Sequence, residues 1–146
     1  MKWVTRARPK TDRIACPWLI TKFIDPGAEI LYVPASTVLD VAAAQDAVSF
    51  DAPGASYDHR DGKCTFEVLI DDYKLGGDSA LIRLAKIVHA ADIAADIGTD
   101  PAGPGLLAIG LGGLAAEADD YRLLDRGRFV YDALYAWCQS QVPAPA

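Results

Sequence analysis

The stretch KWVTRARPKTDRIACPWLITKFIDPGAEILYVP, residues 2–34, decides the first half of the fold. Two β-prone runs flank an amphipathic segment, and this order predicts a strand, a helix and a second strand. We expect the strands at residues 2–5 and 29–34 and the helix at residues 16–25. A third short strand at residues 48–50 would complete a small sheet that helices cover.

The rest of the sequence predicts helices. Apolar residues recur at helical spacing from the middle of the chain to its end. The expected caps of three of these helices are Thr65 for residues 66–75, Asp78 or Ser79 for residues 80–93, and Asp119 or Asp120 for residues 121–140. The expected helices are residues 38–47, 66–75, 80–93, 106–118 and 121–140. The predicted fold is therefore α+β and helix-rich, with a three-stranded sheet from the N-terminal half and an all-helical C-terminal half. We expect one domain over residues 1–146, with a frayed PAPA end at residues 143–146.

Composition limits the classes of function. With 146 residues, 51% of them hydrophobic, the chain can bury a core of its own. A net charge of −6 disfavours binding to nucleic acid, whose phosphates the protein would repel. The cysteines are scattered and odd in number, and neither a signal peptide nor a membrane-spanning run is evident. We therefore expect a cytoplasmic protein that acts away from the membrane. A homo-oligomer is compatible with this sequence.

Basic residues concentrate near the amino terminus, although the whole protein is acidic. Six of the 14 lysines and arginines precede residue 23, where Asp12 is the only acidic residue. They are Lys2, Arg6, Arg8, Lys10, Arg13 and Lys22. This asymmetry favours a pocket for a small anionic ligand or substrate. A solvated positive face is the alternative.

The expected helix at residues 16–25 supports an anion site. Pro17 would lie in its first turn, where a missing N–H matters least, with Cys16 near the cap and Arg13 just before it. Unpaired N–H groups at such a helix end, together with nearby guanidinium groups, would hold a tetrahedral oxyanion. The candidates are Arg6 and Arg13, with Arg8 and Lys10 as auxiliaries. Arg13 could instead pair with a buried carboxylate.

The two histidines are the candidates for metal chemistry. His59 lies in SYDHRDGKCTFEVLIDDY, residues 56–73, before an expected helix whose first turn carries Glu67. His89 precedes Asp92 by about one helical turn. Imidazole and carboxylate donors together suit a divalent Zn, Mn or Fe ion, so these four residues are the predicted metal ligands. A first-turn glutamate that interacts only with the helix dipole is the alternative for Glu67.

Asp92 is the most informative of the four candidates. On a helical wheel it lies near the centre of the apolar stripe that Leu81, Leu84 and Val88 form. Because burial of an isolated charge is costly, a carboxylate on such a face needs a partner. That partner could be a metal ion, an arginine or a hydrogen-bonding histidine.

Three segments resemble one bacterial family. They are KWVTRARPKTDRIACPWLITKFIDP (residues 2–26), DHRDGKCTFEVLIDDY (residues 58–73) and FVYDALYAWC (residues 129–138). Over nearly its whole length the chain is similar to the chromate-resistance family typified by the C-terminal domain of ChrB. The resemblance implies a role in chromate resistance; in ChrB this domain follows another domain and takes part in chromate-responsive regulation. Arg6, Arg13 and His59 match polar positions of the family pattern, and His89 matches less closely.

Two classes of function remain. In the first, a metal ion held by histidines and carboxylates acts beside the arginines, which orient an anionic substrate, so that the domain is a small metalloenzyme. In the second, a metal-free module binds chromate or a sulfate-like oxyanion through Arg6 and Arg13, with His59 as a third donor, and regulates a resistance operon through a partner. A third interpretation is that these residues satisfy one another inside an ordinary core.

Overall fold

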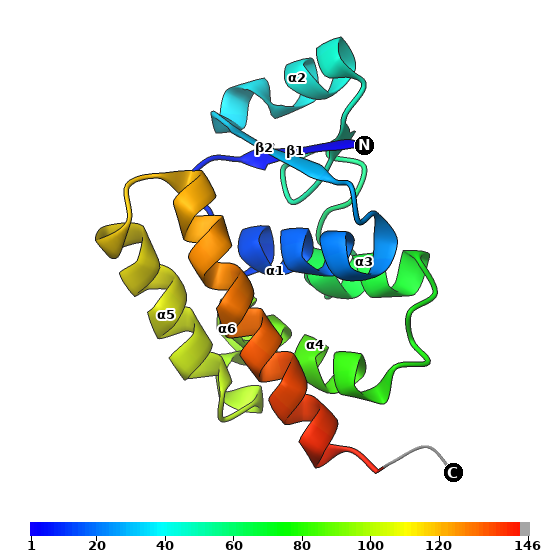
Figure 1. Cartoon of the computed structure of the whole chain (residues 1–146), viewed down its shortest axis with the longest axis vertical. Helices are drawn as coiled ribbons and strands as arrows, with labels where there is room; N and C mark the ends of the chain where they lie inside the picture. The colour runs from blue at the N-terminus through cyan, green and yellow to red at the C-terminus, as the bar shows by residue number, and fades with distance from the viewer. Residues whose placement is uncertain (144–146) are drawn as a thin grey trace.

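The sheet is small and wholly parallel. Figure 1 shows the computed structural model of the chain, which describes residues 1–143. Strands β1 (Lys2–Arg6), β2 (Glu29–Val33) and β3 (Val48–Ser49) follow the order β2-β1-β3. Trp3 lies opposite Ile30 on one side and Val48 on the other. This sheet and its helical cover confirm the predicted helix-rich α+β class.

Helices make up most of the remaining chain. They are α1 (Asp12–Leu19), α2 (Val38–Gln45), α3 (Thr65–Asp72), α4 (Ser79–Asp92), α5 (Gly103–Ala116) and α6 (Asp120–Gln141). A π-helical turn (Ile20–Ile24) and two 3-10 turns (Ala35–Thr37 and Ala94–Thr99) connect them to their neighbours. No helix among residues 1–143 is both long and apolar enough to cross a membrane. Most of the PAPA end, residues 144–146, lies outside the described residues, so its predicted fraying stays a prediction.

The sheet separates two cores. On one face α2 covers the sheet (Figure 1), and Val4, Val38 and Ala52 form a small core there. On the other face Trp3 enters a larger core to which α1, α3, α4 and α6 all contribute. Alternate residues of a strand point to opposite faces, so Trp3 and Val4 belong to different cores. Helix α1 lies directly beneath the sheet and connects it to the helical half (Figure 1).

Helix α1 begins at Asp12 rather than at the predicted Cys16. Pro17 therefore lies inside the helix and lacks the N–H that would bond to the carbonyl of Arg13. The hydroxyl of Tyr32 donates to that carbonyl instead, at 2.6 Å. The predicted start was wrong because a side chain from β2, distant in sequence, compensates for the proline. The helix amino terminus expected beside Cys16 therefore does not exist.

Candidate functional site

Four segments of the chain meet at one imidazole. The Nε2 atom of His59 lies 3.0 Å from Oδ2 of Asp92, 3.4 Å from Oδ2 of Asp12 and 3.4 Å from Oδ1 of Asp51. His59 is in the loop before α3, Asp12 begins α1, Asp51 follows β3, and Asp92 ends α4. We call these four residues the His59 cluster.

Asp12 is the buried centre of this cluster, with a side chain that is 1% exposed. Its Oδ2 accepts the backbone N–H of Thr65 at 2.8 Å, and its Oδ1 accepts that of Phe66 at 3.0 Å. Asp12 therefore satisfies the first N–H groups of α3, a capping task that the sequence pattern assigned to Thr65. Burial raises the pKa of Asp12, despite the contact with His59 and the hydrogen bond from the N–H of Phe66.

Asp51 joins the cluster to the arginines. Its Oδ1 accepts the hydroxyl hydrogen of Thr65 at 2.8 Å, and its Oδ2 lies 3.5 Å from Nη2 of Arg6 and 3.6 Å from Nε of Arg13. Burial by itself would raise the pKa of Asp51. The contacts with His59 and Thr65 and the charge of Arg6 outweigh burial, so the pKa is lowered.

The carboxylates determine the charge on the imidazole. Contacts with Asp12 and then Asp51 raise the pKa of His59 to about 11, so the imidazole is protonated at neutral pH. Burial, followed by repulsion from Asp12 and Asp51, raises the pKa of Asp92 to about 7. The carboxylates of the cluster are therefore not all readily ionised at the same time. A divalent cation in place of the imidazolium proton would relieve this repulsion.

The cluster also has a way in from solvent. The side chain of His59 is 46% exposed, whereas that of Asp92 is 13% exposed. One ligand atom from each of Asp12, His59 and Asp92 lies within 4.8 Å of the others. The arrangement can therefore offer one nitrogen and two oxygens to a metal ion.

The other two predicted ligands, Glu67 and His89, belong to a different group. Nδ1 of His89 lies 2.5 Å from Oε1 of Glu67, and its Nε2 lies 2.6 Å from Oδ2 of Asp96. Cys64 completes a second set of ligand atoms with Glu67 and His89. We call Cys64, Glu67, His89 and Asp96 the His89 cluster. The structure thus divides the predicted ligands into two pairs: His59 with Asp92, and Glu67 with His89.

Arg6 and Arg13 lie at the edge of the His59 cluster. Nε of Arg6 donates to the backbone carbonyl of Asp51 at 2.8 Å. Nη1 of Arg13 donates to the carbonyls of Arg6 and Ala7, at 3.1 and 3.0 Å. Burial, and then the charge of Arg6, lower the pKa of Arg13. Two guanidinium groups thus converge on one oxygen of Asp51.

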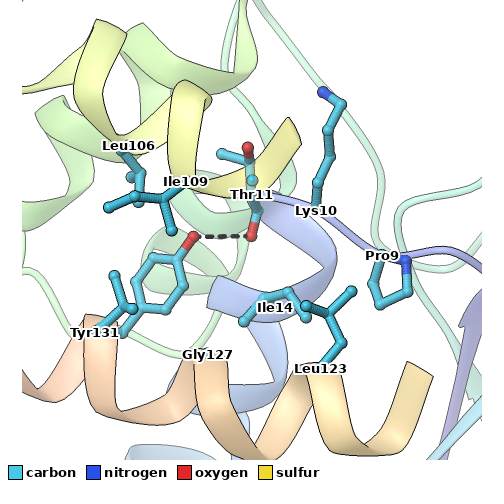
Figure 2. A pocket seen from close by; sticks show the side chains of 11 residues that line it. Pro9, Lys10, Thr11, Ile14, Leu106, Ile109, Leu123, Gly127 and Tyr131 are labelled. Carbon is cyan, nitrogen blue, oxygen red and sulfur yellow. Dashed lines mark hydrogen bonds between the residues drawn. The ribbon is translucent and has the colours of Figure 1, made fainter. Parts of the chain in front are cut away.

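The predicted auxiliaries, Arg8 and Lys10, do not join this pair. The guanidinium of Arg8 ties the end of α5 to the start of α6. It donates to the carbonyls of Leu114, Glu117 and Ala118 and to the carboxylate of Asp120. Lys10 lies at the wall of a mostly apolar cavity of about 40 Å³ between α1, α5 and α6, where Tyr131 donates to the carbonyl of Thr11 (Figure 2). The structure therefore divides the predicted oxyanion residues as well.

Sequence reasoning missed two members of the His59 cluster, Asp12 and Asp51. Asp12 follows β1 and Asp51 follows β3, and these two strands are parallel neighbours. The carboxyl ends of parallel strands lie at the same edge of a sheet, where ligand sites commonly form. The sequence does place an aspartate after each of two expected strands. This pattern predicts a shared site only if the two strands are known to be neighbours, and the sequence does not specify the strand order.

Comparison with known proteins identifies the family. The family described as "ChrB, C-terminal domain" matches residues 3–138, which include every residue of both clusters. Protein ChrB of Cupriavidus metallidurans is 37% identical over 136 residues, covering 92% of this chain and 40% of that protein. The chain thus spans about two fifths of the length of this curated relative. No solved structure matches. The chain belongs to the family of the ChrB C-terminal domain.

Proposed function

We propose that this domain serves chromate resistance by binding a divalent metal ion through Asp12, His59 and Asp92, beside an oxyanion held by Arg6 and Arg13. The observation that carries the proposal is the meeting of three carboxylates at Nε2 of His59, at 3.0 to 3.4 Å. An imidazole with carboxylates from separate segments is a common set of ligands for zinc, manganese or iron.

The charge balance of the site supports a bound cation. Asp12 is buried, and a buried carboxylate is stable only when it is paired or coordinates a metal. His59 supplies a positive charge only while it is protonated, and its side chain is half exposed. A divalent ion would release that proton and give the carboxylates a more compact and stronger counter-charge. Open coordination positions could then polarise an anionic substrate or activate a water molecule.

The arginine pair supports an anion next to the metal. Arg6 and Arg13 both approach Oδ2 of Asp51, so the carboxylate already occupies a place that suits an oxygen of a bound oxyanion. The side chain of Arg6 is 35% exposed and can reach a ligand that arrives from solvent. Guanidinium groups match the oxygens of a tetrahedral dianion such as chromate.

Titration with Mn²⁺, which prefers nitrogen and oxygen donors, tests the metal site. We expect the purified wild-type protein to bind Mn²⁺ in the His59 cluster. His59→Gln and Asp92→Asn should each weaken binding by more than about 100-fold, beyond the usual effect of an outer-shell group. Asp72→Asn removes the same charge from an exposed carboxylate that pairs with Arg60, and it should bind Mn²⁺ as the wild type does. Equal affinity in Asp92→Asn and Asp72→Asn would rule out the site.

The convergence of Arg6 and Arg13 on one oxygen also favours the second candidate, a metal-free oxyanion module that acts through a partner. In that case the purified protein contains no metal and binds chromate or sulfate directly. Arg6→Ala and Arg13→Ala should then abolish binding, whereas Arg60→Ala, an exposed arginine outside the site, should not. Chromate binding that requires added metal would instead support the metal-dependent proposal.

A further inference from the structure

We propose that Cys64, Glu67 and His89 form a second metal site, selective for a thiophilic divalent ion such as Zn²⁺. The site is separate from the His59 cluster and does not depend on the function proposed for it. The sulfur atom distinguishes the two sites, because soft thiolate ligands favour zinc over harder ions such as manganese. The structure thus offers two sets of ligands with different metal preferences.

The three ligands come from two helices that pack together. Cys64 precedes α3 and Glu67 lies in its first turn, three residues later, so both side chains are on one side of this helix end. His89 comes from α4, which lies against α3 (Figure 1). One ligand atom from each of the three residues lies within 4.8 Å of the others. One ion could therefore contact all three with small side-chain movements.

Outer contacts already hold these ligands in place. Nε2 of His89 lies 2.6 Å from Oδ2 of Asp96, so its N–H can be donated there while Nδ1 faces Glu67. A histidine that binds a metal usually donates its other N–H to a carboxylate in this way. Oε1 of Glu67 also accepts the backbone N–H of Cys64 at 3.1 Å, which fixes the glutamate beside the cysteine. The contact between Asp96 and His89 therefore supports a metal site independently of the spacing of the three ligands.

The site is shielded but reachable. Cys64 is buried, whereas the side chains of Glu67 and His89 are 21% and 19% exposed. A hollow of about 210 Å³ leads from solvent to Glu67 between α3 and α4. Lys63 at its rim is paired with Asp71. Three protein ligands and an approach from solvent leave a fourth position for water or a small ligand, and the thiol would release its proton to solvent on binding.

Co²⁺ reports directly on the proposed sulfur ligand, because cobalt bound to thiolate shows a charge-transfer band in the near ultraviolet. We expect this band in the wild-type protein, its loss in Cys64→Ser, and its displacement by Zn²⁺. Cys16→Ser and Cys138→Ser remove the other two buried cysteines and should keep the band. The band should also persist in His59→Gln, because the first site contributes no sulfur.

Variants that keep Cys64 cover the case in which Cys64→Ser fails to fold. His89→Gln should weaken Zn²⁺ binding by more than about 100-fold, and Asp96→Asn by about 10- to 100-fold with the cobalt band retained. No band in the wild type, or a band that survives in both Cys64→Ser and His89→Gln, would overturn the second site. Failure of the first site would be visible separately, as Mn²⁺ binding that Asp92→Asn leaves unchanged.

Discussion

The two histidines of this chain lie in clusters of opposite construction. His59 is on a loop; Asp51 precedes it by eight residues, but Asp12 and Asp92 come from helices α1 and α4, distant in the sequence. His89 lies within α4; its partner Asp96 is seven residues away, and its partner Glu67 is in the adjacent helix α3. The first cluster therefore depends on the tertiary fold as a whole. The second depends on one helix cap and one helix–helix contact.

This difference has an energetic consequence. In the His59 cluster Asp12 and Asp51 are almost wholly buried, and each accepts hydrogen bonds from α3. In the His89 cluster Glu67 and Asp96 are partly exposed, so water can replace much of the stabilisation that their contacts with His89 provide. The His59 cluster thus combines a structural task with a set of carboxylates that repel one another. Such unfavourable charge is typical of a binding or catalytic site rather than of a purely structural one.

Of the changes that test this difference between the clusters, Asp12→Ala should have the largest effect on stability. The change leaves the N–H groups of Thr65 and Phe66 without their acceptor and removes a buried partner of His59. We expect a loss of about 3–5 kcal/mol in the free energy of unfolding, measured by urea denaturation at neutral pH in the presence of a chelator. Glu67→Ala, the matched change in the His89 cluster, should cost about 1 kcal/mol through the lost helix cap. Equal losses in the two variants would contradict the difference between the clusters.

The next effect is the dependence of stability on pH. The pKa of His59 is raised to about 11 in the folded state, so its contribution is complete below its unfolded value of 6.5 and is lost as the pH rises toward 11. The pKa of Asp92 is raised to about 7, so its ionisation destabilises the fold as the pH rises from the unfolded value of 3.8 through 7. Both shifts have the same sign. The metal-free protein should lose about 1–2 kcal/mol between about pH 5 and pH 9, once the exposure of His59 is taken into account.

Bound metal should reverse this slope. Metal ligands must be deprotonated, so Mn²⁺ affinity, and with it the melting temperature at saturating Mn²⁺, should rise from about pH 5 to pH 8. Melting curves with chelator and with Mn²⁺ measure the two slopes in one protein. The slope without metal should flatten in His59→Gln. Parallel slopes with and without Mn²⁺ would show that the ion does not compete with the His59 proton.

The same difference explains what the sequence could predict. The caps of α4 and α6 were each expected at one of two residues, Asp78 or Ser79 and Asp119 or Asp120, because a cap acts within three residues. In the structure the side chains of Asp78 and Asp119 accept backbone N–H groups at the helix starts. The apolar stripe of α4 predicted that Asp92 has a partner, but left open whether this is a metal ion, an arginine or a histidine. A carboxylate on that stripe needs a partner, and His59 is the partner in the structure.

What could not be predicted depends on strand order and distant compensation. Asp12 and Asp51 are neighbours only because β1 and β3 pair in parallel, and local pattern carries no information on that pairing. The start of α1 was misplaced for a related reason. Pro17 lies within helix α1, where Tyr32, on strand β2, donates to the carbonyl of Arg13 in place of the missing proline N–H. In each case, a local rule was overridden by a contact between distant segments.

The smallest effect is the most specific, because its sign separates a binding site from a structural ion pair. Burial, and then repulsion from Asp12 and Asp51, raise the pKa of Asp92, so its charge is unfavourable in the metal-free fold. Asp92→Asn keeps the shape of the side chain and removes this charge. We expect it to stabilise the metal-free protein by about 1 kcal/mol at pH 8, while Mn²⁺ binding is lost. Asp72→Asn should have the opposite sign, since Arg60 lowers the pKa of Asp72. Urea denaturation with chelator measures both variants. A clear loss of stability in Asp92→Asn would mean that Asp92 serves His59 as a structural partner and that no cation is needed there.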